Sequence, residues 1–146
     1  MSSVRPAYRL LSALAALLLL LASLTACSGG ITREEAKTAM DSLLSALDNE
    51  NYAEAAALFH PDSAMSEDLL TAFAEQVKTK VGIDLTEGAV VEKITGMSSS
   101  YYDSAVGGSR YALTAKIKAG DKTADLTVEV IRNDRGYGIF RVECNP

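Results

Sequence analysis

Three side chains in this sequence are of the types that most often do covalent or acid–base chemistry. The 146 residues contain two cysteines, Cys27 and Cys144, and a single histidine, His60. A cysteine thiolate is a nucleophile and a metal ligand, and histidine is the usual general acid or base near neutral pH. Only His60 and Cys144 lie outside the N-terminal segment, and one histidine with one cysteine is too few for a zinc site, so we expect no metal and no cofactor.

Cys27 follows a distinctive N-terminal segment. Arg5 and Arg9 come first, an almost unbroken apolar run fills residues 10–24, and small residues then lead into the cysteine. A basic region followed by a short apolar run is the pattern of a secretory signal peptide. The run is too short for a transmembrane helix, which needs about 20 apolar residues to cross the hydrocarbon core.

The four residues Leu24-Thr25-Ala26-Cys27 resemble the lipobox of bacterial lipoproteins. The resemblance implies that cleavage falls between Ala26 and Cys27, that the Cys27 sulfur receives a diacylglyceryl group, and that the new amino terminus can be acylated. The alternative is a plain secreted protein with an incidental cysteine. An ordinary signal peptidase prefers small residues at positions −3 and −1, and Leu24 at −3 disfavours that alternative.

These observations predict a lipid-anchored protein with three parts. Residues 1–26 form the signal peptide, residues 27–31 the lipidated tether, and residues 32–146 one folded domain. The protein is then extracytoplasmic and anchored to the bacterial cell membrane, or to the outer membrane in a host that has one. Because three or four extended residues span only ~10–14 Å, the domain must lie close to the bilayer surface.

The charge of the predicted mature chain excludes one class of partner. The 14 basic side chains fall to 12 without Arg5 and Arg9, against 19 acidic ones, which leaves a net charge of −7. Nucleic-acid binding relies on a basic surface that neutralises phosphates, so we expect no nucleic acid partner. With Cys27 consumed by lipid, Cys144 is the only free thiol and no internal disulfide can form.

The first half of the domain has the apolar spacing of helices. Thr32 with Glu35 matches a capping box at the start of the first helix. Pro61 stops the second helix, because the residue before a proline is driven out of the α region. The predicted helices cover residues 32–48, 51–60 and 66–82.

From Gly88 the apolar period changes to two, which indicates strands. Residues 89–97 form a loosely patterned first strand, and residues 98–104 a loop or a frayed strand end. If Gly120-Asp121 is a two-residue hairpin loop, Leu113 pairs with Val128 and every apolar pair of the two flanking strands falls on one face.

The last hairpin is predicted to have a three-residue loop, Asp134-Arg135-Gly136. A two-residue loop would place Arg141 opposite Val128 on the core face, which disfavours it. The longer loop pairs Val130 with Phe140, Val128 with Val142, Leu126 with Cys144 and Glu129 with Arg141.

Three helices followed by an antiparallel meander must pack on one side of a curved sheet, so the fold class is α+β. The order helix–helix–helix–four strands resembles the cone-shaped fold of the nuclear transport factor two family, also called cystatin-like. The stretch from Asn51 to Asp62 is similar to the second-helix region of small bacterial lipoproteins with that fold. The resemblance implies a sheet closed by helices over a pocket, and frequent dimerisation, but no single activity.

The inward face of this cone supplies the candidate pocket residues. They are Phe59, Phe73, Tyr111, Leu113, Val128, Val130, Phe140 and Val142. None carries a carboxylate or an imidazole, so we expect a non-catalytic domain that binds a small apolar ligand or a protein. The alternative is a cone-fold enzyme of isomerase or dehydratase type that uses His60 with Asp62, or Tyr111.

The predicted register also leaves an apolar patch on the outer face of the sheet. Ile131 lies opposite Ile139 there, with Tyr137 at the hairpin end. Clustered exposed apolar side chains often mark interfaces, so the patch predicts a homodimer or an envelope protein partner. Alternatively, a loop of the same chain containing Tyr101 and Tyr102 covers it.

Overall fold

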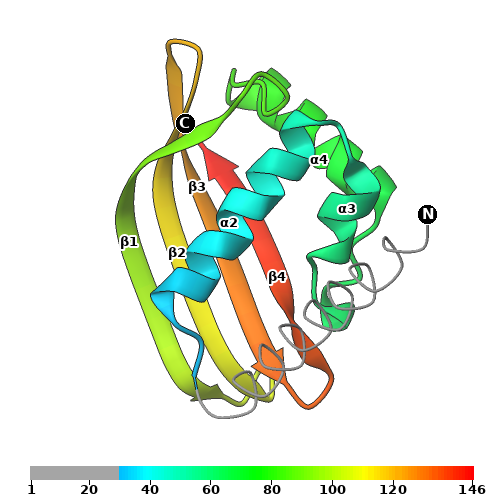
Figure 1. Ribbon diagram of the computed structural model, residues 1–146, viewed down its shortest axis with the longest axis vertical. Coiled ribbons are helices and arrows are strands. Elements are labelled where there is room, and N and C mark those ends of the chain that lie inside the picture. The colour runs from blue at the N-terminus through cyan, green and yellow to red at the C-terminus, as the bar shows by residue number, and fades with distance from the viewer. Residues whose placement is uncertain (1–29) are drawn as a thin grey trace, which may run out of the picture.

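The computed structural model describes residues 30–146, and the predicted signal peptide, its cleavage site and Cys27 lie outside them. The described chain is an α+β domain with three α-helices, one short 3-10 helix and a four-stranded antiparallel meander (Figure 1). The elements are α2 (Arg33–Asp48), α3 (Tyr52–Ala57), η1 (Pro61–Ser63), α4 (Glu67–Lys80), β1 (Val90–Asp103), β2 (Gly108–Ala119), β3 (Lys122–Asn133) and β4 (Gly136–Asn145). The strand order β1-β2-β3-β4 leaves β1 and β4 as the two edges of an open sheet.

Helix α2 begins with the predicted capping box. The Thr32 hydroxyl accepts a hydrogen bond from the Glu35 amide at 3.2 Å, and the Glu35 carboxylate accepts one from the Thr32 amide at 2.8 Å. The same carboxylate forms an ion pair with Arg132 of β3 at 2.7 Å. Burial alone would raise the pKa of Glu35, but the hydrogen bonds from Thr32 and Arg132 outweigh it and lower the pKa. The cap therefore holds the start of α2 to the sheet.

The helices lie on one face of the sheet, with α2 crossing the strands and α3 and α4 on the β4 side (Figure 1). The buried residues of α2, among them Met40, Leu43 and Leu47, form one core with the inward side chains of β2 and β3. Leu113 and Val128 lie at its centre with no exposed surface. The interior is therefore filled by side chains, as protein cores are.

The register of β2 and β3 is as the turn chemistry predicts. Ala119 pairs with Lys122 across the loop Gly120-Asp121, and Leu113 pairs with Val128. Gly120 has a φ of 63°, a left-handed conformation that glycine adopts at little cost. The pairing confirms the predicted hairpin and puts its apolar residues on the helix-covered face.

The predicted loop of the β3–β4 hairpin is wrong. Asn133 pairs with Gly136, so the loop has only two residues, and Val130 pairs with Ile139 rather than with Phe140. A register shift between Glu129 and Val130 leaves Phe140 as an extra residue on β4, and beyond it Glu129 pairs with Arg141 as predicted. A β-bulge thus places Ile139 on the core face and keeps Arg141 off it.

Asn133 explains why the shorter loop is stable. Its side-chain oxygen accepts a hydrogen bond from the Arg135 amide at 2.9 Å, which closes the turn, and lies 2.9 Å from Nε2 of His60. Its amide nitrogen donates to Asp62 at 3.0 Å and to the Val106 carbonyl at 2.9 Å. These contacts between segments far apart in sequence fix the end of β3.

The edge strand β4 is covered by the chain that follows α3. The His60 amide donates to the Ile139 carbonyl at 2.8 Å, and the Ile139 amide donates to the Leu58 carbonyl at 2.9 Å. A Cβ atom at Gly138 would lie 2.5 Å from the His60 nitrogen, so only glycine allows this approach. The second helix ends at Ala57, earlier than predicted, because Leu58 and the two residues after it pair with β4.

The other edge strand, β1, is longer than predicted. It runs through Tyr101 and Tyr102 to Asp103, where the sequence indicates a loop or a frayed end. Its pairing with β2 is interrupted by three irregularities, and none of its 14 residues is fully buried. Bulges of this kind bend a strand and increase its local twist.

Candidate functional site

The predicted pocket residues belong for the most part to the packed core. Five of them are buried, with exposed fractions between 0% and 8%: Phe59, Tyr111, Leu113, Val128 and Val130. Phe73 and Val142 are partly buried and line a surface groove of about 350 Å³ between α4 and the end of β4. Phe140 lies in the bulge, half-buried and outside the main core. Most of the predicted pocket residues therefore pack in the hydrophobic core and do not line a pocket.

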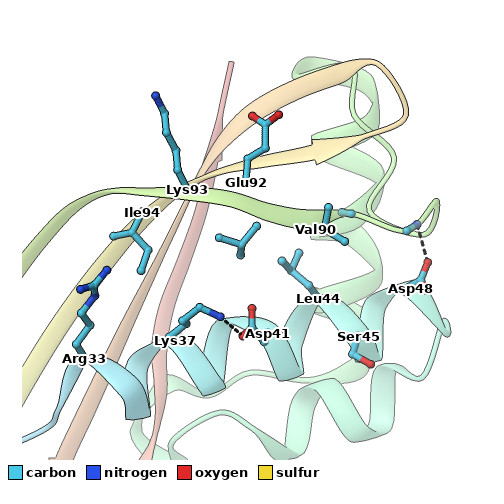
Figure 2. Close-up of a pocket in the computed structure, with 13 residues that line it drawn as sticks. Arg33, Lys37, Asp41, Leu44, Ser45, Asp48, Val90, Glu92, Lys93 and Ile94 are labelled. Atoms are coloured by element: carbon cyan, nitrogen blue, oxygen red, sulfur yellow. Dashed lines mark hydrogen bonds and ion pairs between the residues drawn. The ribbon is translucent and has the colours of Figure 1, made fainter.

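The largest hollow among those described lies between α2 and β1, and we call it the α2–β1 groove (Figure 2). Its volume is about 610 Å³, within the range of ligand sites in proteins. Helix α2 lines it with Arg33, Lys37, Asp41, Leu44, Ser45 and Asp48, and the other wall is formed by residues 88–94.

The groove combines an apolar floor with a charged rim. Leu44 is 3% exposed, and Ile94 is partly buried and packs against the core. On the rim, Lys37 forms an ion pair with Asp41 at 2.7 Å. The Gly88 amide donates to the Asp48 carboxylate at 2.7 Å and joins the two walls at one end (Figure 2). Such a surface suits an occupant that has both apolar and polar groups.

The groove lies beside the open edge of the sheet. Within residues 30–146, no segment forms backbone hydrogen bonds with the outer edge of β1, whereas β4 is covered by residues 58–60. Unpaired amides and carbonyls of an edge strand are available to a partner chain. Sequence reasoning missed the groove, because the lining residues Arg33, Lys37 and Asp41 lie on what the periodicity indicates is a solvated helix face.

His60 is brought together with Asp62, but both ring nitrogens are engaged. Nδ1 accepts a hydrogen bond from the Asp62 amide at 3.0 Å, and Nε2 lies 2.9 Å from the Asn133 side-chain oxygen. Because Nδ1 accepts a hydrogen bond, Nε2 carries the ring proton and donates a hydrogen bond to the Asn133 side-chain oxygen. The residue is 1% exposed and lines none of the grooves described above. Its contacts join η1 to the β3–β4 hairpin.

Tyr111 is also committed to a structural contact. The side chain is 6% exposed, and its hydroxyl lies 3.4 Å from the Met97 sulfur, a weak acceptor. Met97 belongs to the neighbouring strand β1. The phenol therefore helps to hold the edge strand to the sheet.

Cys144 is partly buried at the end of β4, where it lines the groove beside α4. Burial, and to a lesser degree the nearby Asp125 carboxylate, raise the pKa of its thiol to about 11. Only the thiolate attacks electrophiles, so this cysteine is a poor nucleophile at neutral pH.

At pH 8, we expect Cys144 of the folded protein to react with iodoacetamide on the order of 100-fold more slowly than an ordinary thiol. Mass spectrometry of samples taken over time gives the rate. The same protein unfolded in guanidinium chloride is the control and is expected to react at the ordinary rate. Equal rates in the two states would contradict the raised pKa.

The three predicted interface residues do not form one outer patch. Ile139 lies in the main core with 0% exposed surface, because the bulge turns it inward. Ile131 is absent from that core and lies on the opposite face, but it has no exposed surface, so the prediction that it forms part of an exposed patch is wrong. Tyr137 is 40% exposed, with the Arg132 guanidinium 4.8 Å from the centre of its ring.

The outer face of the sheet carries an ionic cluster that the sequence pattern did not indicate. Arg110 forms ion pairs with Glu129 at 2.8 Å and with Asp103 at 3.0 Å. The Ala105 amide and the Arg110 guanidinium both donate to Asp103 and lower the pKa of its carboxyl. The cluster links β1, β2 and β3 near the end of the sheet where Ile131 is buried.

Comparisons with known proteins add no family assignment. The sequence matches no protein-family model, and searches of curated proteins and of solved structures find no significant similarity. Among residues 30–146, no helix has both the length and the apolar character needed to cross a bilayer.

Proposed function

We propose that the protein is a bacterial lipoprotein whose domain binds a partner polypeptide at the extracytoplasmic surface of a membrane. The anchor is Cys27, which completes the lipobox-like sequence after a basic and apolar leader. The domain starts close behind it, because Ile31 is already part of the core and Thr32 caps α2. The receiving membrane is the cell membrane, or the outer membrane in a host that has one.

We assign the domain to the cystatin-like cone of the nuclear transport factor two family. Helices on one face of a four-stranded antiparallel meander support this assignment. Members of that family often use the space between helices and sheet as a pocket. Here side chains fill that space, so binding is expected at the rim of the sheet, in the α2–β1 groove.

The observation that carries the binding function is the contrast between the two sheet edges. The edge of β4 is covered by residues of the same chain, whereas β1 has no fully buried residue and borders the groove. An extended peptide beside β1 gains backbone hydrogen bonds from the edge and can place side chains in the groove. A polypeptide segment therefore fits this site better than a small apolar ligand.

A catalytic role finds little support in the candidate residues. An isomerase or dehydratase would use His60 with Asp62, or Tyr111, as acid or base. The hydrogen bonds of His60 are used within the fold, and the Tyr111 hydroxyl is turned toward Met97. We therefore propose a non-catalytic binding domain.

Photo-crosslinking in the intact cell tests the groove. Lys37 on the groove rim and Thr71 on the exposed side of α4 are each replaced by a photoreactive benzoyl-phenylalanine in the full chain. We expect illumination to give an adduct of defined mass from position 37 and none from position 71. The same adduct from both positions, or none from position 37, would contradict binding in the groove.

A further inference from the structure

The folded domain begins against an exposed aromatic residue of β1. A Cβ atom at Gly30 would lie 3.3 Å from Cδ2 of Tyr101, so the chain enters the domain in contact with this ring. Ile31, the next residue, is 8% exposed and packs in the core. The point of entry is therefore fixed relative to the end of β1.

Tyr101 and Tyr102 are the most exposed of the large hydrophobic side chains in the described domain. Tyr101 is 76% exposed and Tyr102 is 67% exposed. Their backbone is nonetheless held in place, because Ser109 donates a hydrogen bond to the Tyr101 carbonyl at 2.9 Å and Ser100 donates one to the Tyr102 carbonyl at 2.8 Å. Single apolar residues scattered over a surface are normal and need no explanation. Two adjacent exposed tyrosines on an ordered strand end are less common and indicate a contact surface.

The length of the tether sets how far these rings can be from the anchor. Cys27 precedes Gly30 by three residues, and three extended residues span at most about 11 Å. If Cys27 carries lipid, Tyr101 must lie near the headgroups of the same membrane. Tyrosine is favoured at that depth, because its ring is apolar and its hydroxyl can stay hydrated.

We infer that Tyr101 and Tyr102 insert at the headgroup level of the membrane that holds Cys27, and thereby set the orientation of the domain. This inference rests on the proposed lipid anchor. Val90 lies at the far end of β1, at most roughly 36 Å from Tyr101 at ~3.3 Å of rise per strand residue. The α2–β1 groove lies along the part of β1 that is farther from the rings, because its β1 wall is formed by residues 88–94 (Figure 2).

The contact is aromatic rather than ionic. The predicted mature chain carries a net charge of −7. The nearby Arg110 is already paired with Asp103 and Glu129. Attraction to anionic lipid therefore contributes little, and the tyrosines should enter zwitterionic phosphatidylcholine membranes equally well.

A single introduced tryptophan can report how deeply its position enters the membrane, because the chain has no tryptophan of its own. Tyr101→Trp keeps an aromatic ring at the proposed contact. Val90→Trp is the matched control, since Val90 is 58% exposed at the opposite end of the same strand. Each variant is purified from membranes as the mature protein and reconstituted into phosphatidylcholine vesicles, with or without lipid brominated on its acyl chains near the headgroups.

Brominated lipid quenches tryptophan only at short range. We expect Tyr101→Trp to lose most of its emission intensity in brominated vesicles and Val90→Trp to keep it. Flotation of the vesicles is measured in parallel. Protein that floats with the vesicles while Tyr101→Trp stays unquenched, or is quenched no more than Val90→Trp, would overturn the inference and leave the anchor standing. Protein that does not float would overturn the anchor and the inference with it.

Discussion

Replacing Cys27 with serine is expected to abolish lipid labelling of the protein and to release it from membranes. A serine hydroxyl cannot replace the sulfur that the lipobox resemblance identifies as the site of diacylglyceryl transfer. Each buried methylene contributes about 0.8 kcal/mol, so two or three acyl chains give stable attachment, which the variant is expected to lose. Metabolic labelling with a fatty acid, followed by separation of membrane and soluble fractions, measures both effects.

Cys144→Ser is the control for this experiment. Cys144 lies in the folded domain with its thiol half-buried, so its replacement is expected to leave both labelling and membrane retention unchanged. Labelling that persists in Cys27→Ser, or that disappears in Cys144→Ser, would contradict the assignment of the anchor.

Ile139→Ala is expected to lower the free energy of unfolding by about 2–5 kcal/mol, the range for truncating a buried aliphatic side chain. Ile139 has no exposed surface and lies in the main core beside its partner Val130. The neighbouring change Phe140→Ala is expected to cost clearly less, although it removes a larger side chain. Phe140 is half-buried in the bulge and lies outside the main core.

Denaturant unfolding of the two variants measures this difference. The hairpin predicted from the sequence alone would give the opposite order, because it places Phe140 inside and Ile139 outside. A larger loss for Phe140→Ala than for Ile139→Ala would therefore contradict the bulge. Lys116→Ala, on the polar face of β2, is the surface control and is expected to change stability by less than about 0.5 kcal/mol.

The comparison of the two hairpins shows what sequence reasoning can determine. The β2–β3 register follows from a local turn, Gly120-Asp121, and from strict alternation on both sides of it. The β3–β4 register depends on contacts that are distant in sequence, because Asn133 binds His60 and Asp62 and because Gly138 must admit the backbone of His60. The alternation of apolar and polar residues cannot reveal such contacts. A two-residue loop followed by a bulge fits the alternation near Arg141 as well as the predicted three-residue loop does.

The candidate site was predictable only in part, for a related reason. The sequence pattern identifies the inward residues of the sheet, such as Leu113 and Val128, but not whether they enclose a cavity or pack together. The α2–β1 groove arises because β1 is an edge strand that α2 leaves incompletely covered. Which strand remains at the open edge is a property of the assembled sheet.

The proposed anchor and the proposed membrane contact of the tyrosines together bear on how β1 meets a partner. If both hold, the open edge of β1 is kept close to proteins at the membrane surface. The covered edge of β4 leaves β1 as the edge open to strand pairing within the described domain. Because the unpaired backbone groups of an exposed edge can pair with another chain, β1 is the edge at which a partner strand is expected to add.

The most direct test of the lipid anchor is the mass of the N-terminal peptide of mature protein purified from membranes. We expect the mature chain to begin at Cys27 and this residue to carry the added mass of a diacylglyceryl group, with or without a further acyl group on its amine. An N-terminal peptide that begins elsewhere, or that contains an unmodified Cys27, would contradict the lipid anchor.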